Sequence, residues 1–191
     1  MKIAVIDSTI RKDSRTRKVL NNVISNFNDV EFLNINLSDY EMELTNAHNF
    51  DKKNTEQLYF DLSKSIAECD GLIIAAPFWD MSYPALLKAF LEKVTILDVM
   101  FKNGEDKCIG ISKNKFLLYI TTRGMNIKSG SKLDGATPSL KALCYLWGIP
   151  KFICAGEGNF DYVSEEEINN KVRHLSSKCI KILKGEINGK N

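Results

Sequence analysis

Short apolar runs of strand character alternate along this chain with longer segments in which apolar residues recur at helical spacing. The strand-like runs cover residues 2–7 (KIAVID), 30–37 (VEFLNINL), 71–76 (GLIIAA), 115–121 (KFLLYIT) and 151–155 (KFICA). β-branched and aromatic residues are frequent in them, as the pleated surface of a strand favours. The run 71–76 is apolar at every position, which is typical of a strand covered on both faces of a parallel sheet.

Each strand-like run is followed by a segment whose pattern predicts a helix. The predicted helices cover residues 16–27, a stretch marked by Leu58, Leu62 and Ile66, residues 84–94, residues 137–148 with Thr137-Pro138 as cap and start, and a stretch opened by the capping-box residue Ser164. A polar, irregular connection (residues 38–53) and an insertion (residues 96–114) interrupt this alternation.

The repeated strand–helix order predicts an α/β fold, a doubly wound five-stranded parallel sheet with helices on both faces. The chain has 191 residues and no internal repeat, so we expect one domain over residues 1–191. In such sheets ligands bind beyond the carboxyl ends of the strands, where the strand order reverses. The loops after the first, third and fourth strands are therefore the places to look for a site.

The composition excludes several classes of function. The net charge is only +2 and the basic residues are dispersed, so nothing indicates a nucleic-acid or membrane partner. The five cysteines form no CxxC pair, and His48 and His174 lie in unrelated segments, which argues against a disulfide framework and a metal site. No segment has the pattern of an export signal or a membrane span, so we expect a cytoplasmic protein with reduced thiols.

The loop after the first strand, residues 8–16, is rich in hydroxyl groups and has no glycine. Because the first glycine of the chain is Gly71, neither a dinucleotide-binding fingerprint nor a Walker loop is present here. Ser8, Ser14 and Thr16 could instead donate to an anion, such as a phosphate, at the start of the following helix. The alternative is ordinary N-capping by Ser14 or Thr16.

The loop after the third strand, PFWDMSYP, concentrates aromatic and thioether side chains where water is expected. Loops normally lie at the surface, so Phe78, Trp79 and Met81 need a flat apolar partner, which a tricyclic ring would supply. Asp80 could accept a hydrogen bond from a ring N–H or face water. Alternatively, these side chains fill a gap under the sheet edge or form an oligomer contact.

The loop after the fourth strand begins Thr122-Arg123-Gly124-Met125. Gly124 permits a positive φ or a close approach of the backbone to a ligand, and Arg123 carries a permanent charge that we expect at the mouth of the site. For Arg123 alone, an exposed position or a salt bridge is the alternative. A phosphate seat, an aromatic cradle and a cationic edge together describe a site for flavin mononucleotide (FMN).

The stretches STIRKDSRT, AAPFWDMSYPALLKAF and ITTRGM together resemble the FMN-dependent NADH-azoreductase and quinone-oxidoreductase family of flavodoxin-like proteins. The resemblance implies a sheet of order 2-1-3-4-5, tight non-covalent FMN, NADH or NADPH as donor, and two-electron transfer through flavin N5 to quinone, azo or nitroaromatic acceptors. It also implies a homodimer with active sites at the interface, for which the apolar residues 96–101 would form a wall facing the partner or the substrate.

The resemblance also assigns the residues of the site. The FMN phosphate maps to Ser8, Ser14, Arg15 and Thr16, the isoalloxazine to Pro77, Phe78, Trp79, Asp80 and Met81, and its pyrimidine edge to Thr122, Arg123, Gly124 and Met125. Arg123 would stabilise negative charge at the flavin N1–O2 edge, and Trp79 would stack on the acceptor.

The chain departs from the family pattern at three of these positions. Trp79 stands where tyrosine is frequent, Asp80 where asparagine is common, and Met125 where a second glycine is usual. Two alternative functions stay open. One is a flavodoxin-like electron carrier that does not oxidise NAD(P)H directly, and the other is a binding module without cofactor.

Overall fold

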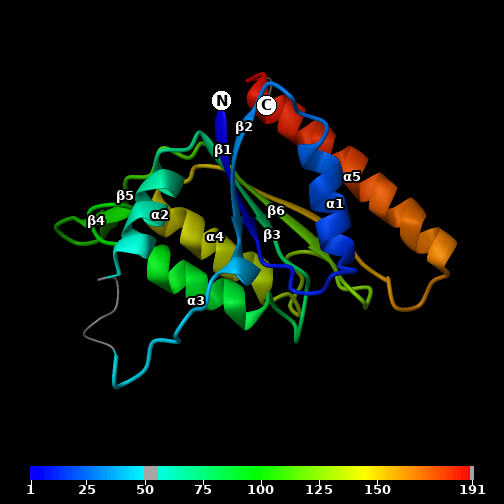
Figure 1. The fold of residues 1–191 in the computed structure, drawn as a ribbon, viewed down its shortest axis with the longest axis horizontal. Coiled ribbons are helices and arrows are strands. Elements are labelled where there is room, and N and C mark those ends of the chain that lie inside the picture. Colours follow the sequence, from blue (N-terminus) through cyan, green and yellow to red (C-terminus); the bar gives the residue numbers. More distant parts are fainter. Residues whose placement is uncertain (50–55, 190–191) are drawn as a thin grey trace.

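The computed structural model describes residues 1–49 and 56–189, and its centre is a five-stranded parallel sheet of order β2-β1-β3-β6-β7 (Figure 1). The strands are β1 (Lys2–Asp7), β2 (Glu31–Asn36), β3 (Gly71–Ala75), β6 (Leu117–Thr122) and β7 (Phe152–Glu157). The helices are α1 (Arg15–Ile24), α2 (Gln57–Ala67), α3 (Ala85–Val94), α4 (Ala136–Trp147) and α5 (Glu165–Ile187), with a short 3-10 turn, η1 (Leu37–Asp39). The predicted order 2-1-3-4-5 is confirmed, because β6 and β7 are the fourth and fifth strands of this sheet.

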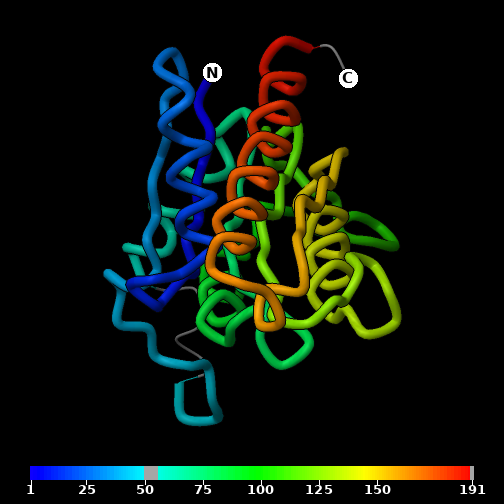
Figure 2. Tube along the Cα trace, turned by 90° about the vertical axis from the view of Figure 1, so that its right-hand side faces the viewer, coloured from blue at the N-terminus to red at the C-terminus, as the bar shows by residue number. Residues whose placement is uncertain are grey.

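Both faces of the sheet are covered by helices, as the apolar run of β3 predicts. Figures 1 and 2 show α1 and α5 side by side on one face, while α2, α3 and α4 lie on the other. Successive side chains of a strand point to opposite faces. Accordingly, Ile3 and Val5 of β1 pack under α1 and α5, whereas Ala4 and Ile6 belong to the opposite core layer. Because β1, β3 and β6 pair in parallel, their carboxyl ends lie at one edge of the sheet.

One predicted helix differs in detail from the structure, and another agrees at its cap. In α2 the buried stripe runs through Tyr59, Ser63 and Ile66, while Leu58 is 51% exposed, so the prediction has the helix right and one of its marker residues wrong. Ser164 caps α5 as predicted, with its hydroxyl oxygen accepting from the Glu167 N–H at 3.3 Å.

The two interruptions of the alternation contain little regular structure. The insertion forms a small antiparallel hairpin of β4 (Phe101–Asn103) and β5 (Cys108–Gly110). Within its apolar start, Ile96 and Met100 are buried in the core, so only part of that stretch is available as a wall. In the predicted connection 38–53, residues up to 49 follow η1 without a further helix or strand, and residues 50–53 lie outside the described residues.

All five cysteines are free thiols. Burial raises the pKa of Cys69 to about 11 and those of Cys144 and Cys179 to about 12; these three are called the buried cysteines below. Cys108 is exposed in the hairpin and Cys154 is half-buried. The thiolate is the reactive form, so the buried cysteines are chemically inert in the folded protein.

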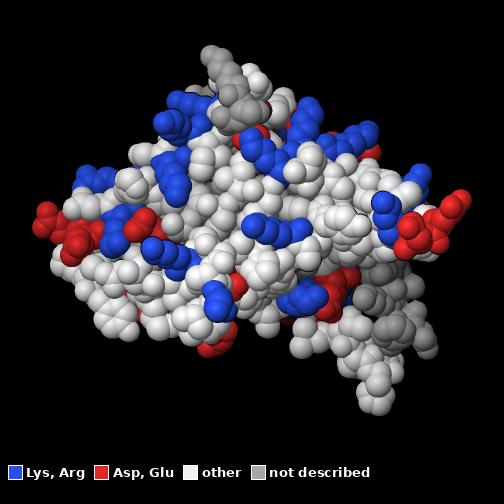
Figure 3. Space-filling view, turned by 180° about the vertical axis from the view of Figure 1, so that it is seen from behind, with Lys and Arg blue, Asp and Glu red and all other residues white. Residues whose placement is uncertain are grey.

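The surface does not concentrate charge of one sign over the face seen in Figure 3. Basic side chains are spread there among uncharged ones, and acidic side chains are most evident at its two ends with others between them. Within residues 1–49 and 56–189, no His, Cys, Asp or Glu side chains group in threes or more to hold a metal ion. The same residues include no helix whose length and apolar character would let it cross a membrane.

Candidate active site

A cavity of about 190 Å³ opens at the carboxyl ends of β1, β3 and β6, where the three loops selected from the sequence meet. It is lined by Ile10, Arg11, Asp13, Ser14, Arg15, Pro77, Phe78, Trp79, Thr122, Arg123, Gly124 and Asp161. A neighbouring cavity of about 340 Å³ is lined by Phe78, Asp80, Met81, Gly124, Met125 and Asp161. The structure therefore brings together every residue of the predicted site except Ser8 and Thr16, which belong to neither lining.

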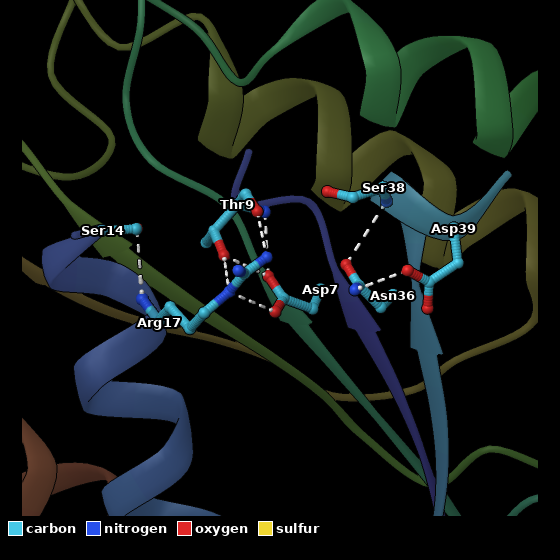
Figure 4. Close-up of polar contacts among 7 residues, drawn as sticks. All are labelled: Asp7, Thr9, Ser14, Arg17, Asn36, Ser38 and Asp39. Carbon is cyan, nitrogen blue, oxygen red and sulfur yellow. Dashed lines mark hydrogen bonds and ion pairs between the residues drawn. The ribbon is translucent and has the colours of Figure 1, made fainter. Parts of the chain in front are cut away.

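The glycine-free loop after β1 is held by side chains (Figure 4). The Asp7 carboxylate accepts from the Thr9 N–H at 2.8 Å and from the Thr9 hydroxyl at 2.6 Å. Arg17 reaches back from α1, and its Nε–H donates to Asp7 at 3.0 Å and to Thr9 Oγ1 at 2.7 Å. Sequence analysis missed this clamp, although an aspartate followed two residues later by a hydroxyl residue is a known turn signal.

Three of the four residues assigned to the phosphate already have partners within the chain. Ser14 caps α1, its oxygen accepting from the Arg17 N–H at 3.2 Å, so its own O–H is still able to donate. Arg15 forms an ion pair with Asp161 at 2.9 Å. Thr16 is buried and shares a hydrogen bond of 2.7 Å with the Thr122 hydroxyl, in which either oxygen can be the donor.

The aromatic loop is a tight two-residue turn. The backbones of Trp79 and Ser82 exchange two hydrogen bonds of 2.8 Å, and Asp80 and Met81 between them have φ of 47° and 66°. Consecutive left-handed residues define a type I′ turn, which normally uses glycine or asparagine. Methionine there stores about 1 kcal/mol of strain or more. In this turn the Trp79 and Met81 side chains are 38% and 42% exposed, so they do not fill a gap under the sheet.

Arg123 does not lie at the mouth of the site, and the salt-bridge alternative describes it correctly. It is 2% exposed, its Nη2 contacts Asp134 at 3.2 Å, and its Nη1 donates to the Ile127 carbonyl at 2.6 Å. The guanidinium also lies over the Phe78 ring, 4.8 Å from its centroid, a distance at which cation–π attraction operates. Arg123 therefore ties the turn after β6 to the aromatic loop after β3.

Asp134 and Asp161 are two further residues of this region that sequence analysis missed. The buried carboxylate of Asp134 accepts from the N–H groups of Gly130, Ala136 and Thr137, from the Thr137 hydroxyl and from Arg123. Burial by itself raises the pKa of Asp134, but the hydrogen bonds from Thr137 and Gly130 and the charge of Arg123 outweigh it, and the net pKa lies below its usual value. Helix α4 begins at Ala136 after the N-cap Gly135, so Thr137 is not its cap, and the Asp134 carboxylate accepts from the first N–H groups of the helix.

Gly124 closely approaches a side chain of another loop. A Cβ at this position would lie 1.9 Å from Asp161 Oδ2, so no other residue fits without displacing that carboxylate. The arrangement as a whole combines a helix N-terminus, arginine side chains and a flat aromatic surface at one sheet edge. Such an edge suits a planar ligand that carries an anionic group.

Comparison with known proteins identifies similar sequences over most of the chain. Residues 1–133 match the family model described as NADPH-dependent FMN reductase. An FMN-dependent NADH:quinone oxidoreductase from Clostridium beijerinckii is 33% identical over 112 residues, which make up 54% of this chain and 55% of that protein. The match thus spans about half the length of that relative. One of the same name from Clostridium perfringens is 24% identical over 196 residues and matches 96% of this chain and 98% of its own length.

Solved structures agree with the fold. An FMN-dependent NADH-azoreductase from Bacillus anthracis, crystallised in complex with FMN, superimposes with a TM-score of 0.77 at 15% sequence identity, covering 95% of this chain and 98% of that one. At this level of identity the likeness concerns the architecture of the sheet and its helices.

Proposed function

Because the chain belongs to the NADPH-dependent FMN reductase family, we propose that it is an FMN-dependent NAD(P)H oxidoreductase that delivers two electrons to quinone, azo or nitroaromatic acceptors. One observation carries this proposal. The start of α1, the aromatic turn after β3 and the Gly124 turn after β6 line a single cavity at the carboxyl edge of the sheet. This is the edge at which α/β sheets bind their ligands.

The residues around this cavity fit FMN. The first turn of α1 offers N–H groups without intrahelical acceptors, and Ser14 and Arg15 add donors beside it. Ser8 lies outside the cavity lining, but its buried Oγ has no hydrogen-bond partner in the part of the chain that the structure describes, so we keep its assignment to the phosphate in the proposal. Phe78 and Trp79 supply flat apolar surface for the ring system.

Bound FMN would supply the two-electron chemistry between the nicotinamide donor and the acceptor, and the protein supplies binding and orientation. We assign Trp79 to the stacking of the acceptor, because its ring is exposed at the cavity. We assign Arg123 a positioning role, because its guanidinium packs over the Phe78 ring that lines the cavity. Its Nε is buried and has no acceptor among the described residues, so we also assign this N–H to the N1–O2 edge of the flavin.

Titration with FMN followed by an anaerobic donor assay tests the proposal. Quenching of FMN fluorescence on addition of the purified protein measures binding. Loss of the visible flavin absorbance after addition of NADH, and separately of NADPH, measures direct oxidation of the donor. Absence of FMN binding would favour a module without cofactor, and binding without bleaching by either donor would favour an electron carrier.

We further propose a homodimer with active sites at its interface. A groove of about 490 Å³ lies beside α3 and α4, and its apolar lining is contributed by Leu91, Leu97, Phe101, Leu143 and Leu146. Leu97 is 44% exposed, and an apolar groove of this size favours burial against a second copy. Sedimentation should show a dimer that Leu97→Glu weakens and that Leu133→Glu, at an exposed leucine outside the groove, leaves intact.

Two simpler expectations accompany this function. We propose that residues 1–191 act as one FMN-binding domain, since all five strands of the main sheet are contributed by residues 2–157. We also propose that the protein works in the reducing cytoplasm, which its five free cysteines support.

A further inference from the structure

Asp161 places a carboxylate inside the cavity that we assign to FMN. It comes from the loop after β7, and its Oδ1 pairs at 2.9 Å with Nη1 of Arg15 on the first turn of α1. Both residues line the cavity. The Asp161 side chain is 60% exposed and the Arg15 side chain 34% exposed, so the pair lies at the opening of the cavity and is accessible to solvent.

The loop that carries Asp161 is fastened to the turn after β6. The N–H of Asp161 donates to the Gly124 carbonyl at 3.2 Å, and the N–H of the buried Phe160 donates to the Arg123 carbonyl, also at 3.2 Å. The Arg15 guanidinium lies over the Phe160 ring, 5.4 Å from its centroid. The carboxylate is therefore held against Gly124 and facing Arg15 by contacts on both sides.

This placement creates a competition for Arg15. A phosphate monoester carries a charge of about −1.5 to −2 at neutral pH, and an arginine beside a helix N-terminus is a strong partner for it. Asp161 is already paired with Arg15, and its carboxylate places a negative charge, of the same sign as the phosphate, in the same cavity. An exposed pair of this kind is weak enough to exchange, so a phosphate can displace the carboxylate, at a cost in affinity.

We propose that Asp161 is a specificity-determining residue of the cofactor site. The phosphate of FMN must displace Asp161 from Arg15, whereas riboflavin has no phosphate, so the Asp161–Arg15 pair limits the preference of the site for FMN over riboflavin. The inference rests on the proposed function, because it takes FMN as the ligand.

Replacing Asp161 with asparagine removes the charge and keeps the shape of the side chain against Gly124. We expect Asp161→Asn to lower the Kd for FMN by about threefold to tenfold at low ionic strength, the effect of one charge at close range near a protein surface. The Kd for riboflavin, which has the same ring and no phosphate, should change by less than about twofold. In 0.5 M NaCl the gain for FMN should shrink, because salt screens exposed charges.

The controls separate this effect from others. Asp106→Asn makes the same change of net charge in the exposed hairpin, away from both cavities, and should leave both affinities unchanged. Asp161→Ser should act in the same direction as Asp161→Asn, and circular dichroism checks that each variant is folded.

Each outcome of the titrations decides a different point. Tighter binding of FMN alone supports the inference. An unchanged FMN affinity in Asp161→Asn, or equal tightening of FMN and riboflavin, overturns it while the proposed function stands. If neither the wild type nor Asp161→Asn binds either flavin, the proposed function fails and the inference fails with it.

Discussion

The buried ion pair between Arg123 and Asp134 makes the strongest quantitative prediction about this fold. The two side chains are 2% and 0% exposed and lie 3.2 Å apart. Asp134→Asn keeps one oxygen that can accept from the first N–H groups of α4, but it replaces the other with an NH2 group. The Arg123 cation then stays buried beside a donor, and the Gly130 N–H and the Thr137 hydroxyl lose their acceptor.

We expect this substitution to lower the free energy of unfolding by about 3–5 kcal/mol, the usual cost of removing one partner of a buried pair. Arg123→Met should cost a similar amount, because it leaves the carboxylate unpaired. The double variant Arg123→Met/Asp134→Asn removes both charges together and should be less destabilised than the sum of the two single variants, since no charge is left buried without a partner. The double-mutant cycle should therefore show strong coupling.

Urea unfolding followed by tryptophan fluorescence and far-ultraviolet circular dichroism measures these energies. With a urea m-value of about 2 kcal/mol/M, each single variant should shift the midpoint by roughly 1.5–2.5 M. Glu31→Gln, which breaks the exposed pair with Lys2, is the control and should cost less than about 1 kcal/mol. Single variants as mild as this control, or a double variant as unstable as the sum of the singles, would refute the reasoning.

Three further predictions follow from the turn, the thiols and the buried carboxylate. Met81 has a φ of 66°, so Met81→Gly should change the free energy of unfolding by less than about 1 kcal/mol. Met81→Ile should lower that free energy by about 1–2 kcal/mol, since a β-branched residue resists this conformation. Thermal unfolding of the two variants measures both changes. Iodoacetamide should modify Cys108 in the native protein and reach the buried cysteines only after unfolding, as peptide mass spectrometry would show. The pKa of Asp134 is lowered in the folded state, so the stability that its carboxylate contributes is complete above the unfolded pKa of about 3.9 and is lost as the pH falls through the lower folded pKa. Urea titrations near pH 3 should therefore show a smaller difference between wild type and Asp134→Asn than titrations at pH 7.

Elements whose pattern is local were predictable from the sequence alone. β1 has the predicted bounds, 2–7, and the apolar run from Gly71 became the fully buried strand β3. Ser164 caps α5 as its spacing indicates. The period of apolar positions reports directly which face of an element is buried, because that period follows from backbone geometry within each segment.

The partners of the charged and polar side chains were decided only by the tertiary structure. Arg123 was expected at the mouth of the site, yet the chain folds back within the next loop and buries it against Asp134. Asp161 gave no signal at all, because its position over Gly124 depends on how the loops after β6 and β7 lie side by side. The sequence thus indicated which loops form the site, whereas the pairing of its charges depends on distances between segments that no periodicity encodes.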